Sequence, residues 1–277
     1  MKADCHIHMI LDGVEWKSAI ARHTQRPDDR FIRQALATYR DLGYTWLRDG
    51  GDRWGAGRRA RELAPEYGIT YRTPLAPLCQ AGHYGSFIGE VYTSLPEYAH
   101  LVVKTRETGG DFIKIMISGL MDFHQFGVLT EEGLDPNWIR ELIHIAHEEG
   151  MAVMAHANGA RTMEAAAAAG VDSIEHGAYP DRDTLAAMAE MGTVWVPTLS
   201  TVGNLRGKGR FPEAEVQKIL ACALENLENY RGMVAPGTDA GAWAVPHGSE
   251  TEAQLLALAG ISEQRLESGI RVLQEKF

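Results

Sequence analysis

The residues of this chain whose types could support chemistry are four histidines, one lysine and one aspartate, spread over five short segments. They are His6, His8, Lys114, His156, His176 and Asp239. Imidazole and carboxylate groups bind divalent metal ions readily, and this set is what two such ions around a shared hydroxide require. A centre of this kind favours attack of metal-bound water on a polarised carbonyl or phosphoryl group.

Short apolar runs alternate with longer amphipathic stretches along the chain. The apolar runs predict strands near residues 2–9, 45–49, 69–76, 112–118, 152–156, 173–176, 194–199 and 234–239. The amphipathic stretches predict helices near residues 27–42, 57–66, 93–108, 136–149, 160–169, 181–191, 212–229, 250–259 and 262–276. Regular alternation of strand and helix favours a parallel sheet, and eight repeats favour closure. We therefore expect an α/β protein with a (β/α)8 TIM barrel, as one domain over residues 1–277.

All the candidate ligands fall at or near the carboxyl ends of predicted strands, where such barrels place their active sites. Successive side chains of a strand point to opposite faces. In the first strand this alternation predicts that Asp4, His6 and His8 point toward the barrel axis, whereas Cys5 and Ile7 point toward the helices. The two-residue spacing of His6 and His8 would let both reach one metal ion.

Composition narrows the class of partner. The chain has 27 Lys and Arg against 37 Asp and Glu, a formal net charge of −10, which argues against nucleic acid and anionic membranes. Three scattered cysteines are too few for a disulfide framework or a thiolate zinc site. We see neither a secretory leader nor a long apolar run, so we expect a cytoplasmic protein that acts on a small-molecule substrate.

Five motifs, in their order along the chain, resemble those of the amidohydrolase superfamily of metal-dependent barrel hydrolases, within it the prolidase-type and imidazolonepropionase-related members. The motifs are DCHIH from residue 4, FIKIMISG from residue 112, MAHANGA from residue 154, AGVDSIEHG from residue 169 and GTDAG from residue 237. Many relatives add a β-sandwich built from residues before the first strand and after the eighth helix. Because this chain opens on the His-x-His strand and closes at Phe277, we expect no accessory β-sandwich.

The resemblance implies a division of the ligands between two metal ions. The two histidines of the first strand would bind the more buried ion, and His156 and His176 the more exposed one. Lys114, carbamylated by CO2, would bridge both ions, and Asp239 would contact the buried ion and serve as general base and then acid. Zinc is the expected metal, with manganese, iron, cobalt and nickel as alternatives. Relatives are often homo-oligomers, so we expect one here.

The resulting hypothesis is a binuclear hydrolase in which a bridging hydroxide cleaves an amide-type C–N bond. A dipeptide, an N-acyl amino acid or a cyclic amide would be the substrate. The alternatives are a mononuclear deaminase, a lactonase or esterase on the same barrel, and a metal-binding barrel without catalysis. Deaminases usually place a glutamate soon after the fifth-strand histidine, whereas His156 is followed by no acid until Glu164.

Further candidates lie in the loops at the predicted barrel mouth. As catalytic residues we expect His83 and Tyr84, and as substrate-binding residues Arg48, Asp49, His124 and His247. Arginine forks and tyrosine hydroxyls would suit a substrate carboxylate or a developing oxyanion. The long polar stretch 12–29 would act as a lid. Tryptophans in these loops would favour an apolar or aromatic substrate group: Trp16, Trp54 and Trp243.

Overall fold

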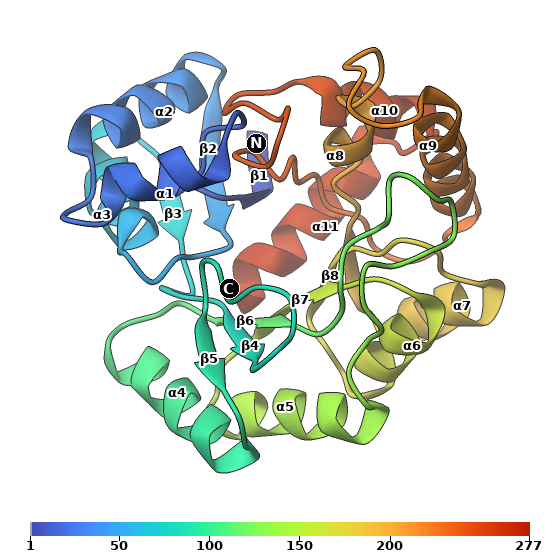
Figure 1. Ribbon diagram of the computed structural model, residues 1–277, viewed down its shortest axis with the longest axis horizontal. Helices are drawn as coiled ribbons and strands as arrows, with labels where there is room; N and C mark the ends of the chain where they lie inside the picture. Colours follow the sequence, from blue (N-terminus) through green and yellow to red (C-terminus); the bar gives the residue numbers. More distant parts are fainter. Residues whose placement is uncertain (1) are drawn as a thin grey trace.

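A computed structural model describes residues 2–277 and shows parallel strands enclosed by helices (Figure 1). The strands are β1 (Lys2–Ile7), β2 (Tyr44–Asp49), β3 (Thr70–Arg72), β4 (Leu78–Gln80), β5 (Glu90–Tyr92), β6 (Ile113–Met116), β7 (Val153–Ala157), β8 (Ser173–His176) and β9 (Val194–Val196). The helices are α1 (Trp16–His23), α2 (Asp29–Asp41), α3 (Ala56–Leu63), the 3-10 helix η1 (Ala64–Tyr67), α4 (Leu95–Glu107), α5 (Pro136–Glu148), α6 (Ala160–Ala168), α7 (Arg182–Glu190), α8 (Ser200–Gly203), α9 (Glu213–Asn229), α10 (Thr251–Leu258) and α11 (Glu263–Lys276). None of the helices in residues 2–277 has the length and apolar character needed to cross a membrane.

The strands form two parallel sheets, with orders β1-β2-β3 and β5-β4-β6-β7-β8-β9. Backbone hydrogen bonds join the two sheets on both sides. On one side the Asp111 amide donates to the Thr73 carbonyl at 2.9 Å. On the other, residues 233–240 lie between β9 and β1: the Trp195 amide donates to Met233 and the Cys5 amide to Pro236. The sheets thus close on themselves, and the prediction of an α/β protein with a (β/α)8 barrel is confirmed.

The eighth predicted strand, 234–239, closes the barrel without being a regular strand. Pro236 has no amide hydrogen to donate to a ladder, and the backbone of Asp239 has a left-handed φ of 56°. The predicted third strand, 69–76, corresponds to β3 alone, and β4 follows it as a strand that was not predicted. Strand β5 and helix α8 were not predicted, because segments this short carry little periodicity, and α1 lies in the polar stretch 12–29 that was predicted to act as a lid. All strands of the described residues belong to the two sheets, so these residues form no β-sandwich.

The residues at the two ends of a helix determine where it begins and ends. At the start of α5 the Asp135 carboxylate accepts from the Asn137 amide at 2.9 Å, and Pro136 takes the first helical position, where its missing amide hydrogen costs nothing. The chain leaves the same helix through Gly150, whose left-handed φ of 71° suits glycine. Such caps explain why the predicted and observed ends of the long helices differ by few residues.

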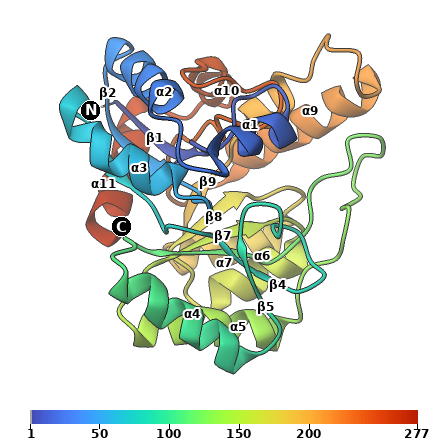
Figure 2. The same ribbon diagram turned by 60° about the vertical axis from the view of Figure 1, so that its left-hand side comes forward.

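The interior of the barrel is apolar at the end opposite the candidate site. Cys5, Phe112, Met154 and Val196 pack there with residues of α11. Figure 2 shows α11 at one edge of the molecule, while the loop after β6 extends on the other side toward α9. Helix α11 therefore closes one end of the barrel and leaves the carboxyl ends of the strands for the site.

The predicted alternation along β1 is wrong at two positions. Cys5 packs inside the barrel, and Asp4 instead bonds Thr238, whose hydroxyl donates to Asp4 Oδ2 at 2.6 Å. The cause is an irregularity in the β1–β2 ladder, where the register shifts between Asp4 and Ile7. One irregular step in a strand reverses the faces of the residues on one side of it.

Candidate metal centre

The predicted metal ligands come together in one pocket with a volume of about 750 Å³. They line it from β1, β6, β7, β8 and the closing segment: His6, His8, Lys114, His156, His176 and Asp239. Asp239 Oδ1 lies 3.2 Å from His8 Nε2 and 3.5 Å from His6 Nε2, and these two nitrogens are 3.3 Å apart. Three ligand atoms thus converge, as metal coordination requires. The rings of His156 and His176 lie beside them, with centroids 4.6 Å apart.

Three of the four histidines are held through one ring nitrogen, which leaves the other available. His6 Nδ1 lies 2.7 Å from Glu175 Oε2. His156 Nε2 donates to the Gly119 carbonyl at 3.1 Å, and His176 Nδ1 lies 2.7 Å from Thr198 Oγ1. Partners of this kind define the tautomer and the ring orientation of metal-binding histidines.

Burial keeps these groups in the forms that bind metal. Desolvation, the largest cause, lowers the pKa of His156 to about 3 and that of His6 and His176 well below the usual value. Desolvation also lowers the pKa of Lys114 to about 8, and its Nζ has no hydrogen-bond partner. Buried polar atoms without partners are rare in proteins. Neutral imidazoles, a reactive amine and the unpaired Asp239 Oδ1 therefore fit a metal centre.

Arg48, predicted to bind substrate, is absent from the residues that line the pocket. It is fully buried and donates to the Cys5 carbonyl, to Ser173 Oγ at 3.0 Å and to Glu175 Oε1 at 2.8 Å. The other oxygen of Glu175 holds His6. Arg48 thus positions a ligand through Glu175. Sequence reasoning missed Glu175, although a glutamate inside the predicted strand 173–176, directly before the ligand His176, was a signal.

Two other predicted substrate contacts are also absent from the pocket lining. Asp49 is buried and accepts from the Met9 amide at 3.0 Å and from Thr73 Oγ1 at 3.2 Å. His247 connects the loop after β1 to helix α2, with Nε2 donating to the Leu11 carbonyl at 3.0 Å and Nδ1 lying 3.1 Å from Tyr39 Oη. Neither side chain lines the pocket, and both hold neighbouring segments of the chain together.

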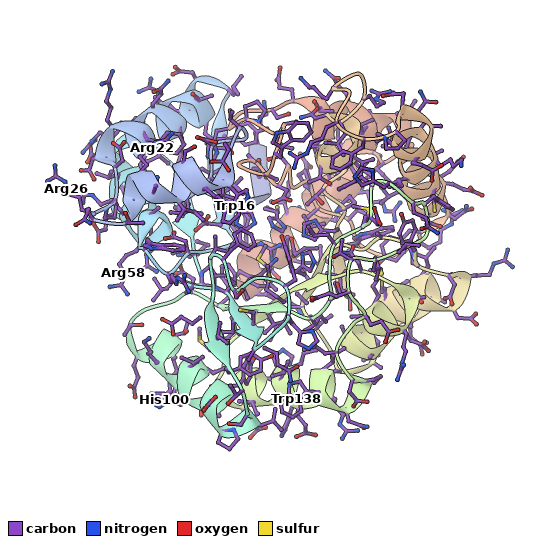
Figure 3. All side chains as sticks on the ribbon, in the orientation of Figure 1. Trp16, Arg22, Arg26, Arg58, His100 and Trp138 are labelled. Atoms are coloured by element: carbon purple, nitrogen blue, oxygen red, sulfur yellow. The ribbon has the colours of Figure 1, made fainter. Side chains whose placement is uncertain are left out.

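Of the remaining predicted site residues, some line the pocket and others do not. Tyr84 lines the pocket and stacks on His156 with ring centroids 4.9 Å apart, and His124 lines it as well. His83 lies outside the lining, with Nδ1 3.6 Å from Glu131 Oε1. Trp16 and Trp243 line the pocket, but Trp54 does not. Figure 3 places Trp16 at the end of α1 nearest the centre of the view.

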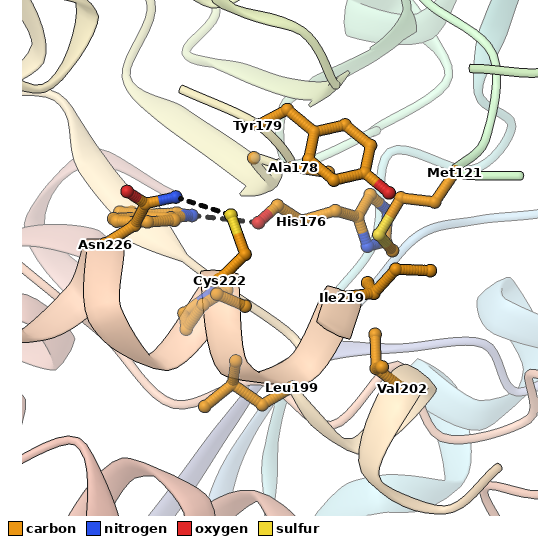
Figure 4. Close-up of a pocket in the computed structure, with 13 residues that line it drawn as sticks. Met121, His176, Ala178, Tyr179, Leu199, Val202, Ile219, Cys222 and Asn226 are labelled. Atoms are coloured by element: carbon orange, nitrogen blue, oxygen red, sulfur yellow. Dashed lines mark hydrogen bonds between the residues drawn. The ribbon is translucent and has the colours of Figure 1, made fainter. Parts of the chain in front are cut away.

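A small cavity of about 20 Å³ lies behind His176 (Figure 4). Trp195 Nε1 donates to the His176 carbonyl at 2.9 Å beside it. His176 has a left-handed φ of 65°, as do Thr198 and Asp239 at 49° and 56°. Such backbone persists only where its surroundings hold it, and it concentrates at functional sites.

Gly50 leaves room for His8, because a Cβ atom at this position would lie 2.3 Å from His8 Cε1. We expect Gly50→Ala to displace the imidazole from Asp239 and to weaken metal binding by about 10- to 100-fold, the usual effect of disturbing a ligand's support. Competition with a chromophoric chelator measures the affinity, and thermal unfolding of metal-free protein controls for misfolding. Unchanged affinity would show that His8 is not a ligand.

Residues 68–253 match the Amidohydrolase family. An uncharacterized protein of Mycobacterium tuberculosis is 28% identical over 265 residues, which cover 88% of this chain and 64% of that protein. Ochratoxinase of Aspergillus niger is 26% identical over 270 residues, which cover 84% of this chain and 55% of the enzyme. The chain spans less than two thirds of the length of these curated relatives.

Solved structures share the fold. A Xaa-Pro dipeptidase with bound methionine superposes with a TM-score of 0.72 at 21% identity, covering 98% of this chain and 74% of that one. The A. niger ochratoxinase structure gives a TM-score of 0.77 at 20% identity, covering 96% and 68%. The family match extends over more than half of the residues, and the motifs that suggested it converge in one pocket. The chain belongs to the amidohydrolase family.

Proposed function

We propose that this chain is a metal-dependent hydrolase that cleaves an amide-type C–N bond, in a dipeptide, an N-acyl amino acid or a cyclic amide. The observation that carries the proposal is the convergence of all the predicted ligands on one pocket. The family match supports metal-dependent hydrolysis in general. Two relatives, named ochratoxinase and Xaa-Pro dipeptidase, support C–N bonds as the target.

The donor set suits two divalent ions, with zinc as our first expectation. The two β1 histidines and Asp239 would hold one ion, His156 and His176 the other, and a carbamate on Lys114 would bridge them. Bound ions would supply Lewis acidity and lower the pKa of water to about 7. Proton transfer and stabilisation of the developing oxyanion would depend on side chains of the protein.

Asp239 would carry the proton from the attacking water to the leaving nitrogen. Its Oδ1 has no hydrogen-bond partner, and the residue lines the pocket. A carboxylate there can accept the proton of the attacking water and pass it to the leaving nitrogen. Tyr84 lines the same wall, and burial raises its pKa, so the phenol stays protonated. It can donate to the oxygen on which negative charge develops.

Lys114 provides a direct test of the carbamate. Its amine would attack CO2, lose a proton and become an anionic ligand, which a pKa of about 8 favours. In isotopically labelled bicarbonate we expect one carbamate carbon signal in the NMR spectrum of metal-loaded protein, and none for Lys114→Met. We also expect that variant to bind fewer than two metals. A signal equal in both proteins would place the carbamate elsewhere.

The deaminase alternative is less compatible with the site. No acid follows His156 closely, and Asn158 is fully engaged: its Nδ2 donates to the Gly119 carbonyl and its Oδ1 accepts from the Ala178 amide, both at 2.9 Å. An esterase or lactonase uses the same site chemistry, so only assays separate it. We also propose that residues 1–277 form one domain and that the protein is a cytoplasmic homo-oligomer acting on small molecules.

The test of this proposal is turnover by metal-loaded protein. We would assay dipeptides, N-acyl amino acids, cyclic amides, lactones and esters, and measure metal content by elemental analysis. We expect amide cleavage with about two metals per chain. Deamination with one metal would favour the deaminase, preference for esters or lactones would move the activity to those bonds, and no turnover by fully loaded protein would contradict a hydrolase.

A further inference from the structure

One wall of the pocket is built by aromatic residues from three separate segments. Phe123 and His124 lie in the loop after β6, Phe211 lies between α8 and α9, and Trp243 lies beyond the closing segment. Ring centroids of Phe211 are 5.1 Å from those of Phe123 and His124 and 6.2 Å from that of Trp243. The loop after β6 reaches α9, where the Phe126 amide donates to Glu215 Oε2 at 2.8 Å (Figure 2). These contacts join the segments into a continuous surface.

Arg210 lies on this wall with its charge unpaired. Its guanidinium is 4.4 Å from the Trp243 ring centroid and 5.4 Å from that of Phe211. Within residues 2–277 no hydrogen bond or ion pair of Arg210 is found. Aromatic faces orient a guanidinium but do not neutralise it. Stacking therefore holds the exposed guanidinium of Arg210 against the wall, with its N–H donors facing solvent and open to a ligand.

The acids of the pocket do not compensate Arg210. Glu15 accepts from the Lys17 and Ser18 amides at the start of α1, and Asp122 Oδ1 accepts from the His124 amide at 2.7 Å. Asp239 belongs to the metal cluster. Among the described residues that line the pocket Arg210 is the only arginine, so it is the side chain there that can bind a ligand carboxylate in a bidentate way.

The same pocket is lined by a second series of aromatic side chains. From the metal cluster outward, His156 contacts Tyr84, Tyr84 contacts Phe87 with centroids 5.7 Å apart, and Phe87 contacts Trp16 at 5.5 Å. Trp16 is 48% exposed, so the series runs from the buried cluster to solvent. A planar apolar group bound along it would bury its faces against rings.

We infer that the substrate is an amide that carries both a planar aromatic group and a carboxylate, with the carboxylate bound by Arg210. This inference rests on the proposed amide hydrolysis and narrows its substrate class. N-aroyl amino acids and aromatic dipeptides have this chemistry. The same amides with the carboxylate replaced by a carboxamide lose the ion pair, and N-acetyl analogues lose the aromatic contact.

The experiment compares an N-aroyl amino acid with its carboxamide in the wild type, Arg210→Met and Arg210→Lys. The control is Lys208→Met, a nearby cation outside this pocket. We expect the wild type to prefer the carboxylate. Arg210→Met should lower kcat/KM for it by about 10- to 100-fold, mainly through KM, and lower kcat/KM for the carboxamide by much less. Arg210→Lys should recover part of the loss. Equal turnover of both substrates by the wild type, or equal loss on both in Arg210→Met, would overturn the inference.

A binding measurement separates this inference from failure of the proposed function. Trp16 and Trp243 line the pocket, so their fluorescence reports occupancy without catalysis. We expect N-aroyl amino acid to quench it with an affinity that falls in Arg210→Met but not in Lys208→Met. If no amide is hydrolysed, this difference still supports the subsite. Identical affinities in the wild type and Arg210→Met would refute it, whatever the activity.

Discussion

We expect Asp239→Asn to lower kcat by about 10²- to 10⁴-fold, the usual contribution of a positioned acid–base group, while metal remains bound. The amide cannot accept the proton of water, but its oxygen can still approach His6 and His8 as Asp239 Oδ1 does, at 3.5 and 3.2 Å. Steady-state kinetics and metal analysis of the same sample check both halves of this expectation.

The matched control is Asp183→Asn, which removes an exposed carboxylate on α7. We expect the control to retain normal activity and metal content. Near-normal turnover of Asp239→Asn would exclude the residue as proton carrier. Loss of metal together with activity would make Asp239 chiefly a ligand.

Replacing Glu175 with glutamine should destabilise the protein and weaken metal binding together. Arg48, Glu175 and His6 are fully buried and linked by contacts of 2.8 and 2.7 Å. A buried charge that loses its partner costs about 3–5 kcal/mol of folding free energy. Weaker orientation of His6 should reduce metal affinity by about 10- to 100-fold. Denaturant unfolding of metal-free protein and chelator competition measure the two effects.

A double-mutant cycle that combines Glu175→Gln with Arg48→Met tests whether loss of the Arg48–Glu175 ion pair causes the destabilisation. If Glu175 acts by compensating Arg48, the pair of substitutions should destabilise the protein by less than the sum of the single changes. The metal affinity should stay low in the double variant, because His6 still lacks its carboxylate. Strict additivity of the stability changes would mean that the ion pair is not coupled.

Topology explains why the ligands could be predicted from the sequence. Carboxyl ends of successive parallel strands meet at one face of a barrel, so His8 and Asp239 come together although most of the chain separates them. The glycines and acids at helix ends act locally, and α5 accordingly begins and ends where its caps indicate. Neither inference requires knowledge of side-chain packing.

The features that the sequence could not predict are those set by side-chain packing and by irregular backbone. The register shift in β1 that turns Cys5 inward leaves no sequence signal, because it depends on pairing with β2. By sequence alone Arg48 has the features of a substrate-binding arginine, because its partners, Ser173 and Glu175, lie on a strand far along the chain. Loop conformation likewise decides that His247 supports the wall while Arg210 lines the pocket.

The central claim is that two metal ions bind at this pocket, and anomalous scattering from a crystal of metal-loaded protein tests it most directly. We predict two peaks, one bounded by His6, His8 and Asp239 and the other by His156 and His176, with Lys114 between them. A single peak would contradict the binuclear centre. Peaks only elsewhere on the protein, with these side chains unliganded, would contradict the account as a whole.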